Sequence, residues 1–122
     1  MAYMVGVRTL AKRSEFEKLL VSAIDEALNS LGESVKQSTY FHIENKFKVA
    51  RKDIPENLEE FQDGVEKIFG AGARFIEILI MKNVHTKMGL PLKMKGEQLE
   101  FVEYVGAAKR GFLGKGALKR RS

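Results

Sequence analysis

The stretch SEFEKLLVSAIDEALNSLG, residues 14–32, decides the fold, because its apolar residues recur at steps of three and four. This spacing places them on one stripe of an amphipathic helix. Ser14 and Glu17 have the spacing of a capping box, so we expect the helix to begin there, and Gly32 can adopt the left-handed conformation that ends it. The predicted stripe consists of Phe16, Leu19, Leu20, Ala23, Ile24, Ala27, Leu28 and Leu31.

A second helix is predicted after a tight turn at Gly32. Ser34 and Gln37 repeat the capping spacing. A narrower and only moderately apolar face then continues to Lys46 or Lys48.

A connector and a short third helix are expected next. The connector covers residues 49–56, where a proline disfavours helical geometry in the residue before it. We expect Ile54 to fill the core from this connector. Asn57 and Glu60 give a third capping spacing, ahead of an apolar face that ends at Gly70.

The most apolar helix is predicted from residue 71 or 72 to Met88. Its apolar residues cover more than half of its circumference, which is typical of a helix at the centre of a protein. Gly89 and Pro91 are expected to end it, the first as a left-handed cap and the second because proline cannot continue the helix.

Residues 97–110 fit either a strand or a fifth helix. Alternation of Leu99 and Phe101 would suit a strand, whereas the wider apolar spacing suits a helix. We favour the helix, because carboxylates lie in its first turns and Lys109 and Arg110 lie at its end, which matches the helix dipole.

These patterns predict an all-α fold, a compact bundle of four or five helices with a central apolar helix and flexible basic termini. The expected organisation is a basic N-terminal arm (1–13), a helical domain (14–108) and a basic C-terminal tail (109–122). The tail contains three glycines after position 110, and we expect it to be mobile until something binds it. One domain suits a chain of 122 residues.

Charge is distributed unevenly along the chain. All sixteen carboxylates lie between Glu15 and Glu103, while three cations precede residue 14 and six follow residue 108. The ends therefore carry +9 and the middle −4, which together give the net charge of +5. Basic ends of this kind attract polyanions.

The candidate contacts of these ends are phosphate groups of RNA or DNA, with one aromatic side chain that could stack on a base. A solubilising tail without a partner is the alternative, and an anionic membrane surface is a lesser one. The predicted nucleic-acid-binding residues are Arg13, Lys109, Arg110, Phe112, Lys115, Lys119, Arg120 and Arg121.

No catalytic, metal or cofactor motif is evident. The two histidines, His42 and His85, lack a nearby ligand pattern, and we interpret them as structural or surface residues. Gly70 and Gly72 lack P-loop spacing and are better explained by helix ends. A helix-turn-helix around Gly32 is disfavoured, because carboxylates lie on its candidate recognition helix.

Several short stretches also carry a likeness to a known family: residues 27–34 (ALNSLGES), 40–47 (YFHIENKF), 53–55 with Phe61, 68–72 (IFGAG) and 77–80. Through them, residues 24–89 resemble an archaeal (Nitrosopumilus-type) output-domain family, a small all-helical signalling module found alone and fused to sensor or response-regulator parts. The resemblance implies a helical fold and a role in contacting a protein partner. It implies no catalytic residues, and the basic ends lie outside it.

The function predicted from the sequence is a non-enzymatic interaction or signalling module that binds a protein partner, docking through exposed apolar positions of the second or fifth helix. The alternative is nucleic-acid binding through the basic ends. The chain has no cysteine, no signal-peptide pattern and no apolar run near the ~20 residues of a membrane span, so we expect a cytoplasmic protein without cofactors. The sequence leaves homo-oligomerisation open.

Overall fold

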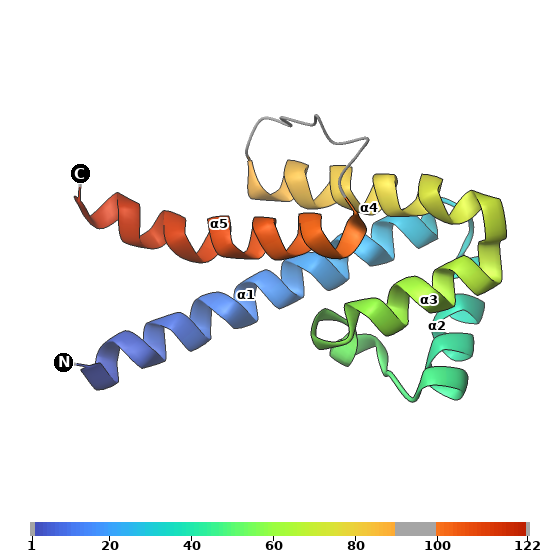
Figure 1. Ribbon diagram of the computed structural model, residues 1–122, viewed down its shortest axis with the longest axis horizontal. Helices are drawn as coiled ribbons and strands as arrows, with labels where there is room; N and C mark the ends of the chain where they lie inside the picture. The colour runs from blue at the N-terminus through green and yellow to red at the C-terminus, as the bar shows by residue number, and fades with distance from the viewer. Residues whose placement is uncertain (1, 90–99, 122) are drawn as a thin grey trace.

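A computed structural model gives the fold, with the backbone described for residues 2–89 and 100–121 and the side chains for 11–89 and 100–113. The predicted all-α bundle is confirmed, and no strand occurs in these parts of the chain (Figure 1). The elements are α1 (Ala2–Asn29), α2 (Glu33–Phe47), the 3-10 helix η1 (Arg51–Glu56), α3 (Leu58–Phe69), the 3-10 turn η2 (Gly70–Gly72), α4 (Ala73–Met88) and α5 (Phe101–Arg121).

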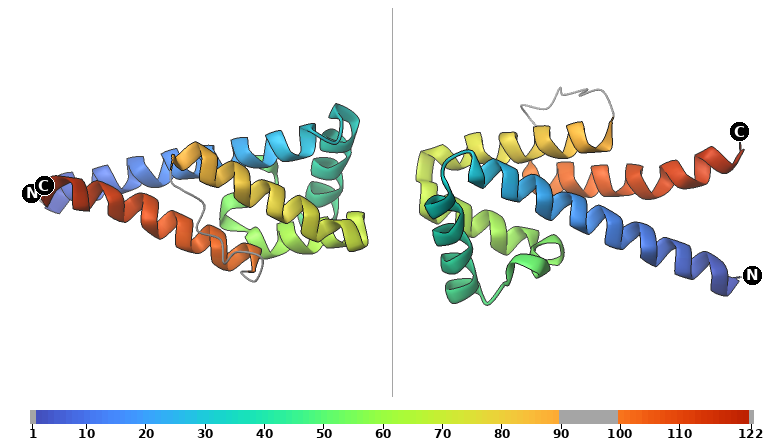
Figure 2. Two further views of the ribbon diagram at one scale, coloured as in Figure 1. Left: turned by 90° about the horizontal axis from the view of Figure 1, so that it is seen from above. Right: turned by 180° about the vertical axis from the view of Figure 1, so that it is seen from behind.

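The longest helix, α1, is the element on which the others assemble. It contacts α2, η1, α4 and α5, and α4 in turn packs against α3 and α5. The amino end of α1 and the carboxyl end of α5 extend beyond this assembly and lie at the same end of the molecule, opposite the α1–α2 turn (Figures 1 and 2).

The predicted apolar stripe of α1 forms the centre of the core. Phe16, Leu20, Ile24 and Leu28 are fully buried, whereas Leu31 lies beyond the helix end and is exposed. Burial of each large apolar side chain contributes about 1.5–3 kcal/mol. The stripe therefore supplies much of the free energy that holds the bundle together.

The predicted start of this helix at Ser14 is wrong. The helix begins at Ala2, so Ser14 lies inside it and is exposed. Residues 2–13 contain no proline and a single glycine, so nothing in them breaks the helix. The predicted N-terminal arm is a continuous part of α1.

The other helix ends follow the glycines more closely than the capping residues. Gly70 and Gly89 have φ of 56° and 71° and end α3 and α4 as predicted. Ser34 does not cap α2, because the helix begins one residue earlier, at Glu33. Asn57 stands at the start of α3, but its side chain donates a hydrogen bond to the Asp53 carbonyl at 2.9 Å instead of capping the helix.

The connector is confirmed as a core element. Ile54 is fully buried, and η1 forms around it although Pro55 lies inside this short helix. The buried side chain anchors η1 against α1. It thereby positions Arg51, the first residue of η1.

Helix α4 is buried along one face. Ile76, Ile80, Met81 and Val84 are buried, whereas Phe75 on the same helix is 60% exposed. Asn83 joins this helix to α1 by donating a hydrogen bond from Nδ2 to the Ala23 carbonyl at 3.1 Å.

The helix predicted within 97–110 is confirmed in its described part, while Glu97 and Gln98 lie outside the described residues. Helix α5 begins at Phe101 and continues past Arg110 to Arg121, through the predicted tail. Phe101, Tyr104 and Val105 are buried. Their packing starts the helix against α3, α4 and α1.

Candidate functional site

The basic residues of the two chain ends lie on helices that reach the same end of the molecule (Figure 2). Arg13 is exposed on α1, and on α5 Arg110 is exposed and Lys109 half-buried. The remaining predicted contacts, Lys115, Lys119, Arg120 and Arg121, lie on the helical backbone of α5, and their side chains are outside the described part. We call this region the basic end, residues 2–13 and 109–121.

Phe112, predicted as a stacking residue, makes a contact inside the protein. Its ring centroid lies 5.6 Å from that of Phe16, and Lys12 Nζ lies 5.8 Å from the same ring centroid. The half-buried ring therefore fixes α5 on α1 near the point where both helices leave the bundle. Sequence patterns gave no sign of this contact, because the two residues are far apart along the chain.

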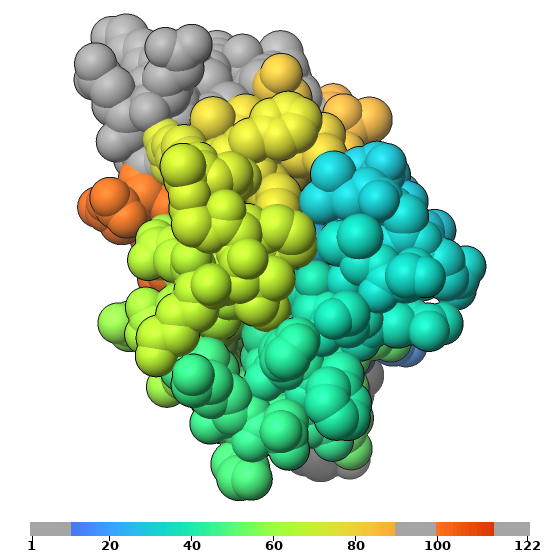
Figure 3. All heavy atoms as spheres, turned by 90° about the vertical axis from the view of Figure 1, so that its right-hand side faces the viewer, coloured from blue at the N-terminus to red at the C-terminus, as the bar shows by residue number. Residues whose placement is uncertain are grey.

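The opposite end of the molecule carries exposed apolar side chains. Figure 3 shows the face formed by the α1–α2 turn, α2, the end of α3 and the start of α4. These elements carry Leu31 (39% exposed), Phe41 (66%), Ile68 (38%) and Phe75 (60%). We call these four residues the apolar end.

Helix α5 does not contribute to such a surface within residues 101–113. Its large apolar side chains there are buried or half-buried. Of the two helices predicted to present apolar positions, α2 therefore does so through Phe41, whereas α5 does not in this range.

A groove runs between α2 and α3 beside Ile68. Its lining includes Ile43, Phe47 and Ile68, with Lys46 from α2 and Lys67 from α3. We call it the α2–α3 groove. His42 also lines it, so one of the two histidines belongs to a surface depression.

Phe41 lies in a separate depression with mixed charge. Glu44 and Asp53 line it together with Lys48. The two sides of α2 therefore differ, since cations but no carboxylates line the α2–α3 groove.

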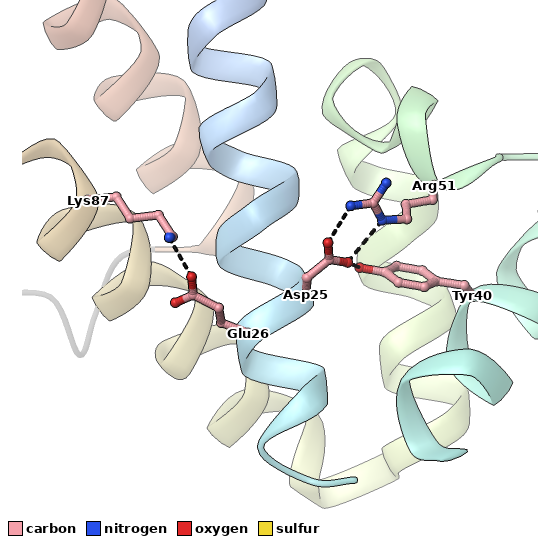
Figure 4. A network of polar contacts seen from close by, with 5 residues as sticks. All are labelled: Asp25, Glu26, Tyr40, Arg51 and Lys87. Atoms are coloured by element: carbon pink, nitrogen blue, oxygen red, sulfur yellow. Dashed lines mark hydrogen bonds and ion pairs between the residues drawn. The ribbon is translucent and has the colours of Figure 1, made fainter. Parts of the chain in front are cut away.

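A polar network joins α1, α2 and η1 (Figure 4). Tyr40 donates a hydrogen bond from its hydroxyl to Asp25 Oδ1 at 2.6 Å, and Arg51 Nε donates to the same oxygen at 3.0 Å. Arg51 Nη2 also pairs with Asp25 Oδ2. A separate ion pair between Lys87 Nζ and Glu26 Oε2, at 2.5 Å, joins α4 to α1.

The network shifts the protonation of its members. Partial burial alone would raise the pKa of Asp25, but the hydrogen bonds from Arg51 and Tyr40 outweigh it and hold that pKa below its usual value. Burial and the hydrogen bond to Asp25 raise the pKa of Tyr40. Asp25 is therefore a stable anion at neutral pH, which suits a structural link between elements.

A buried carboxylate lies on the core face of α4. Glu77 is 3% exposed, its Oε2 has no hydrogen-bond partner among the described residues, and Arg74 Nη1 is 3.8 Å from Oε1. Burial raises the pKa of Glu77, and the neighbouring Glu66 and Glu100 raise it further, against lowering by Gln62 and Arg74. The sequence signal was this single carboxylate, which interrupts the apolar run 75–81 of the most apolar helix.

The histidines lie in different surroundings. His42 is exposed in the α2–α3 groove, whereas His85 Nδ1 lies 2.5 Å from the Tyr104 hydroxyl of α5. Burial raises the pKa of Tyr104. Within the described residues no group of three or more histidine, cysteine or acidic side chains is placed to hold a metal ion.

Comparison with protein-family models, curated proteins and solved structures finds no match to this chain. The resemblance to the archaeal output-domain family therefore stays a prediction. Among the described helices, none is both long enough and apolar enough to cross a membrane.

Proposed function

We propose that this chain is a non-enzymatic interaction or signalling module, acting as an output or adaptor domain that binds a protein partner through its apolar end. The observation that supports the proposal is the exposure of two large aromatic side chains, Phe41 and Phe75. Aromatic residues dominate the binding energy of many protein interfaces. Because both lie on helices fixed by the core, little conformational entropy of the backbone is lost when a partner covers them.

The test is affinity capture from native extract with the wild type and the F41A/F75A double variant, in the presence of nuclease. We expect a protein partner that binds the wild type and is lost from the double variant, while the control K52A/K82A retains it. The comparison requires that F41A/F75A and the wild type have equal melting temperatures. We expect this because both phenylalanines are exposed. A partner that is kept by F41A/F75A and lost when residues 114–122 are removed would contradict the proposal.

The truncation in this experiment starts after residue 113 for a structural reason. Removal from Lys109 onward would also delete Phe112 and its contact with Phe16. A shorter truncation removes cations while leaving that contact in place.

Nucleic-acid binding through the basic end is the second candidate function. It is supported by the arrangement of the termini, which brings two helix ends without a single carboxylate to one end of the molecule (Figure 1). Such a concentration of positive charge favours phosphate contacts. Arg13 and Arg110 are exposed there and are available for them.

A salt titration of duplex DNA binding tests this candidate. If all six tail cations contact phosphates, the slope of log affinity against log salt approaches roughly −5. Changing Lys119, Arg120 and Arg121 to alanine should reduce the slope by about half. Absence of any complex at low salt would rule out nucleic acid as a partner.

A further inference from the structure

We infer that the α2–α3 groove binds an acidic amphipathic helix of the protein partner. This inference rests on the proposed function and adds the chemistry of the partner. It starts from the close approach of two helices that leaves an apolar floor between cationic walls.

Helices α2 and α3 approach closely at the floor of the groove, because they meet at a glycine. A Cβ atom added at Gly64 would lie 2.7 Å from Cγ1 of Ile43, closer than real side chains pack. The absent side chain lets Ile43 pack directly against the backbone of α3. Phe47, half-buried, and Ile68, 38% exposed, complete the apolar lining.

The two walls carry cations that have no counter-ion within the described part of the chain. Lys46 and Lys67 are exposed and form no ion pair there. Lys67 Nζ lies 5.5 Å from the centroid of the Phe47 ring, and this cation–π contact holds the ammonium group beside the groove. No carboxylate lines the groove, in contrast to the depression around Phe41.

An apolar floor between two cationic walls is complementary to a helix with an apolar stripe flanked by carboxylates. Residues at i, i+3, i+4 and i+7 of such a helix would cover Ile68 and Phe47, and acidic residues beside the stripe would face Lys46 and Lys67. Nucleic acid fits less well, because its phosphates gain nothing from the exposed aliphatic side chain of Ile68.

A display selection tests the inference without a known partner. A library of helical peptides of about 16 residues, or roughly 24 Å, is selected against the wild type. We expect enriched peptides to carry an apolar i, i+3, i+4, i+7 stripe flanked by Glu or Asp. Fluorescence anisotropy then measures the best peptide on the wild type and on K46E/K67E, for which we expect about tenfold weaker binding.

Two controls make the result specific to the groove. The K52E/K82E variant has the same net charge as K46E/K67E, but its changes lie outside the groove, so it should bind the peptide like the wild type. Ile68→Ser should weaken binding several-fold and leave its salt dependence unchanged, since it removes apolar contact only. If K46E/K67E melts lower than the wild type, Lys46→Glu alone replaces it.

Several outcomes would overturn the inference. These are no enrichment, enrichment of neutral or basic peptides, equal weakening by both double variants, displacement of the peptide by duplex DNA, or self-association through the groove. If they occur while an F41A/F75A-sensitive partner persists, only the groove assignment fails. Peptide binding as expected, with no partner sensitive to Phe41 and Phe75, would instead overturn the proposed function.

Discussion

The apolar end and the basic end of this molecule are built in different ways. At the apolar end, short helices joined by tight turns expose large side chains such as Phe41 and Phe75 on elements that the core fixes. At the basic end, two long helices continue beyond the core, and the contact between Phe16 and Phe112 holds them together where they leave it.

The difference teaches that one bundle can present two independent surfaces. Apolar contact is short-ranged and requires accurately placed side chains. Charge acts over about 10 Å, so it requires only that cations gather in one region. The basic end gathers cations on two helix ends that contain no carboxylate, so no opposing charge on these segments reduces its positive field.

Loss of the core should destroy both surfaces together. Ile80 is fully buried on α4, and Ile80→Asp would place an unpaired charge there at a cost of several kcal/mol. We expect unfolding or aggregation, measured by circular dichroism and thermal melting. Phe75→Asp on the same helix is the control and should leave the melting temperature nearly unchanged, because Phe75 is exposed. Equal melting curves for the wild type and Ile80→Asp would contradict this placement of α4.

The junction of the basic end should be sensitive to its aromatic contact. Phe16 is 1% exposed, and Phe16→Ala should cost about 3–5 kcal/mol. Phe112→Ala should cost less, about 1–2 kcal/mol, because that ring is half-buried. Chemical denaturation gives both values, and hydrogen exchange should show faster opening of residues 109–113 in the Phe112 variant. Unchanged exchange there would mean that the ring contact does not anchor α5.

The packing under the α2–α3 groove, next to the apolar end, should be sensitive to the close approach of α2 and α3. Gly64→Ala forces Ile43 to move, and we expect a loss of about 1–2 kcal/mol after the gain in helix propensity is deducted. Ile43→Ala removes the clashing atoms. The double variant should therefore lose less free energy of unfolding than the sum of the losses in the two single variants. Additive losses in denaturation would show that the helices do not meet at this point.

Two carboxylates should change stability with pH in opposite senses. The pKa of Asp25 is lowered in the folded protein. Ionised Asp25 therefore contributes its full stabilisation at pH above its pKa in the unfolded chain, and this stabilisation is lost as pH falls through its pKa in the folded protein. Asp25→Asn should lower the free energy of unfolding by about 1 kcal/mol at pH 7, and its difference from the wild type should shrink below pH ~4.

The pKa of Glu77 is raised in the fold, so the folded protein loses stability as pH rises through the unfolded value and up to the folded one. Glu77→Gln should therefore stabilise the protein by up to about 1 kcal/mol at pH 7 and have less effect in acid. Denaturant titrations at pH 3–8 measure both variants. If both substitutions changed the free energy of unfolding in the same direction at pH 7, the opposite pKa shifts of the two carboxylates would be contradicted.

The smallest expected effect concerns Ser14, the residue of α1 that directly follows the basic end. Ser14 lies exposed within α1, so Ser14→Ala should change the free energy of unfolding by no more than about 0.5 kcal/mol. Loss of a capping residue would cost about 1 kcal/mol instead. Thermal melting of this variant therefore tests whether α1 continues through residue 14 or begins there.

The sequence by itself determined the helices and most of their ends. The stripe from Phe16 to Leu28 follows from local periodicity, and Gly70 and Gly89 stop helices because of backbone geometry that each residue carries with it. The predictions based on capping side chains at Ser14 and Ser34 failed. A capping spacing shows that a residue can cap a helix, but it does not show where the helix begins.

Only the tertiary structure decided which side chains of those helices remain in water and which residues meet. Phe75 and Ile80 belong to the same apolar helix, yet one is exposed and the other buried, because α1, α3 and α5 cover one face of α4. Asp25 meets Arg51, and Phe16 meets Phe112, across separations that no local pattern encodes. Such contacts arise from packing between elements, and both candidate surfaces are what that packing leaves uncovered.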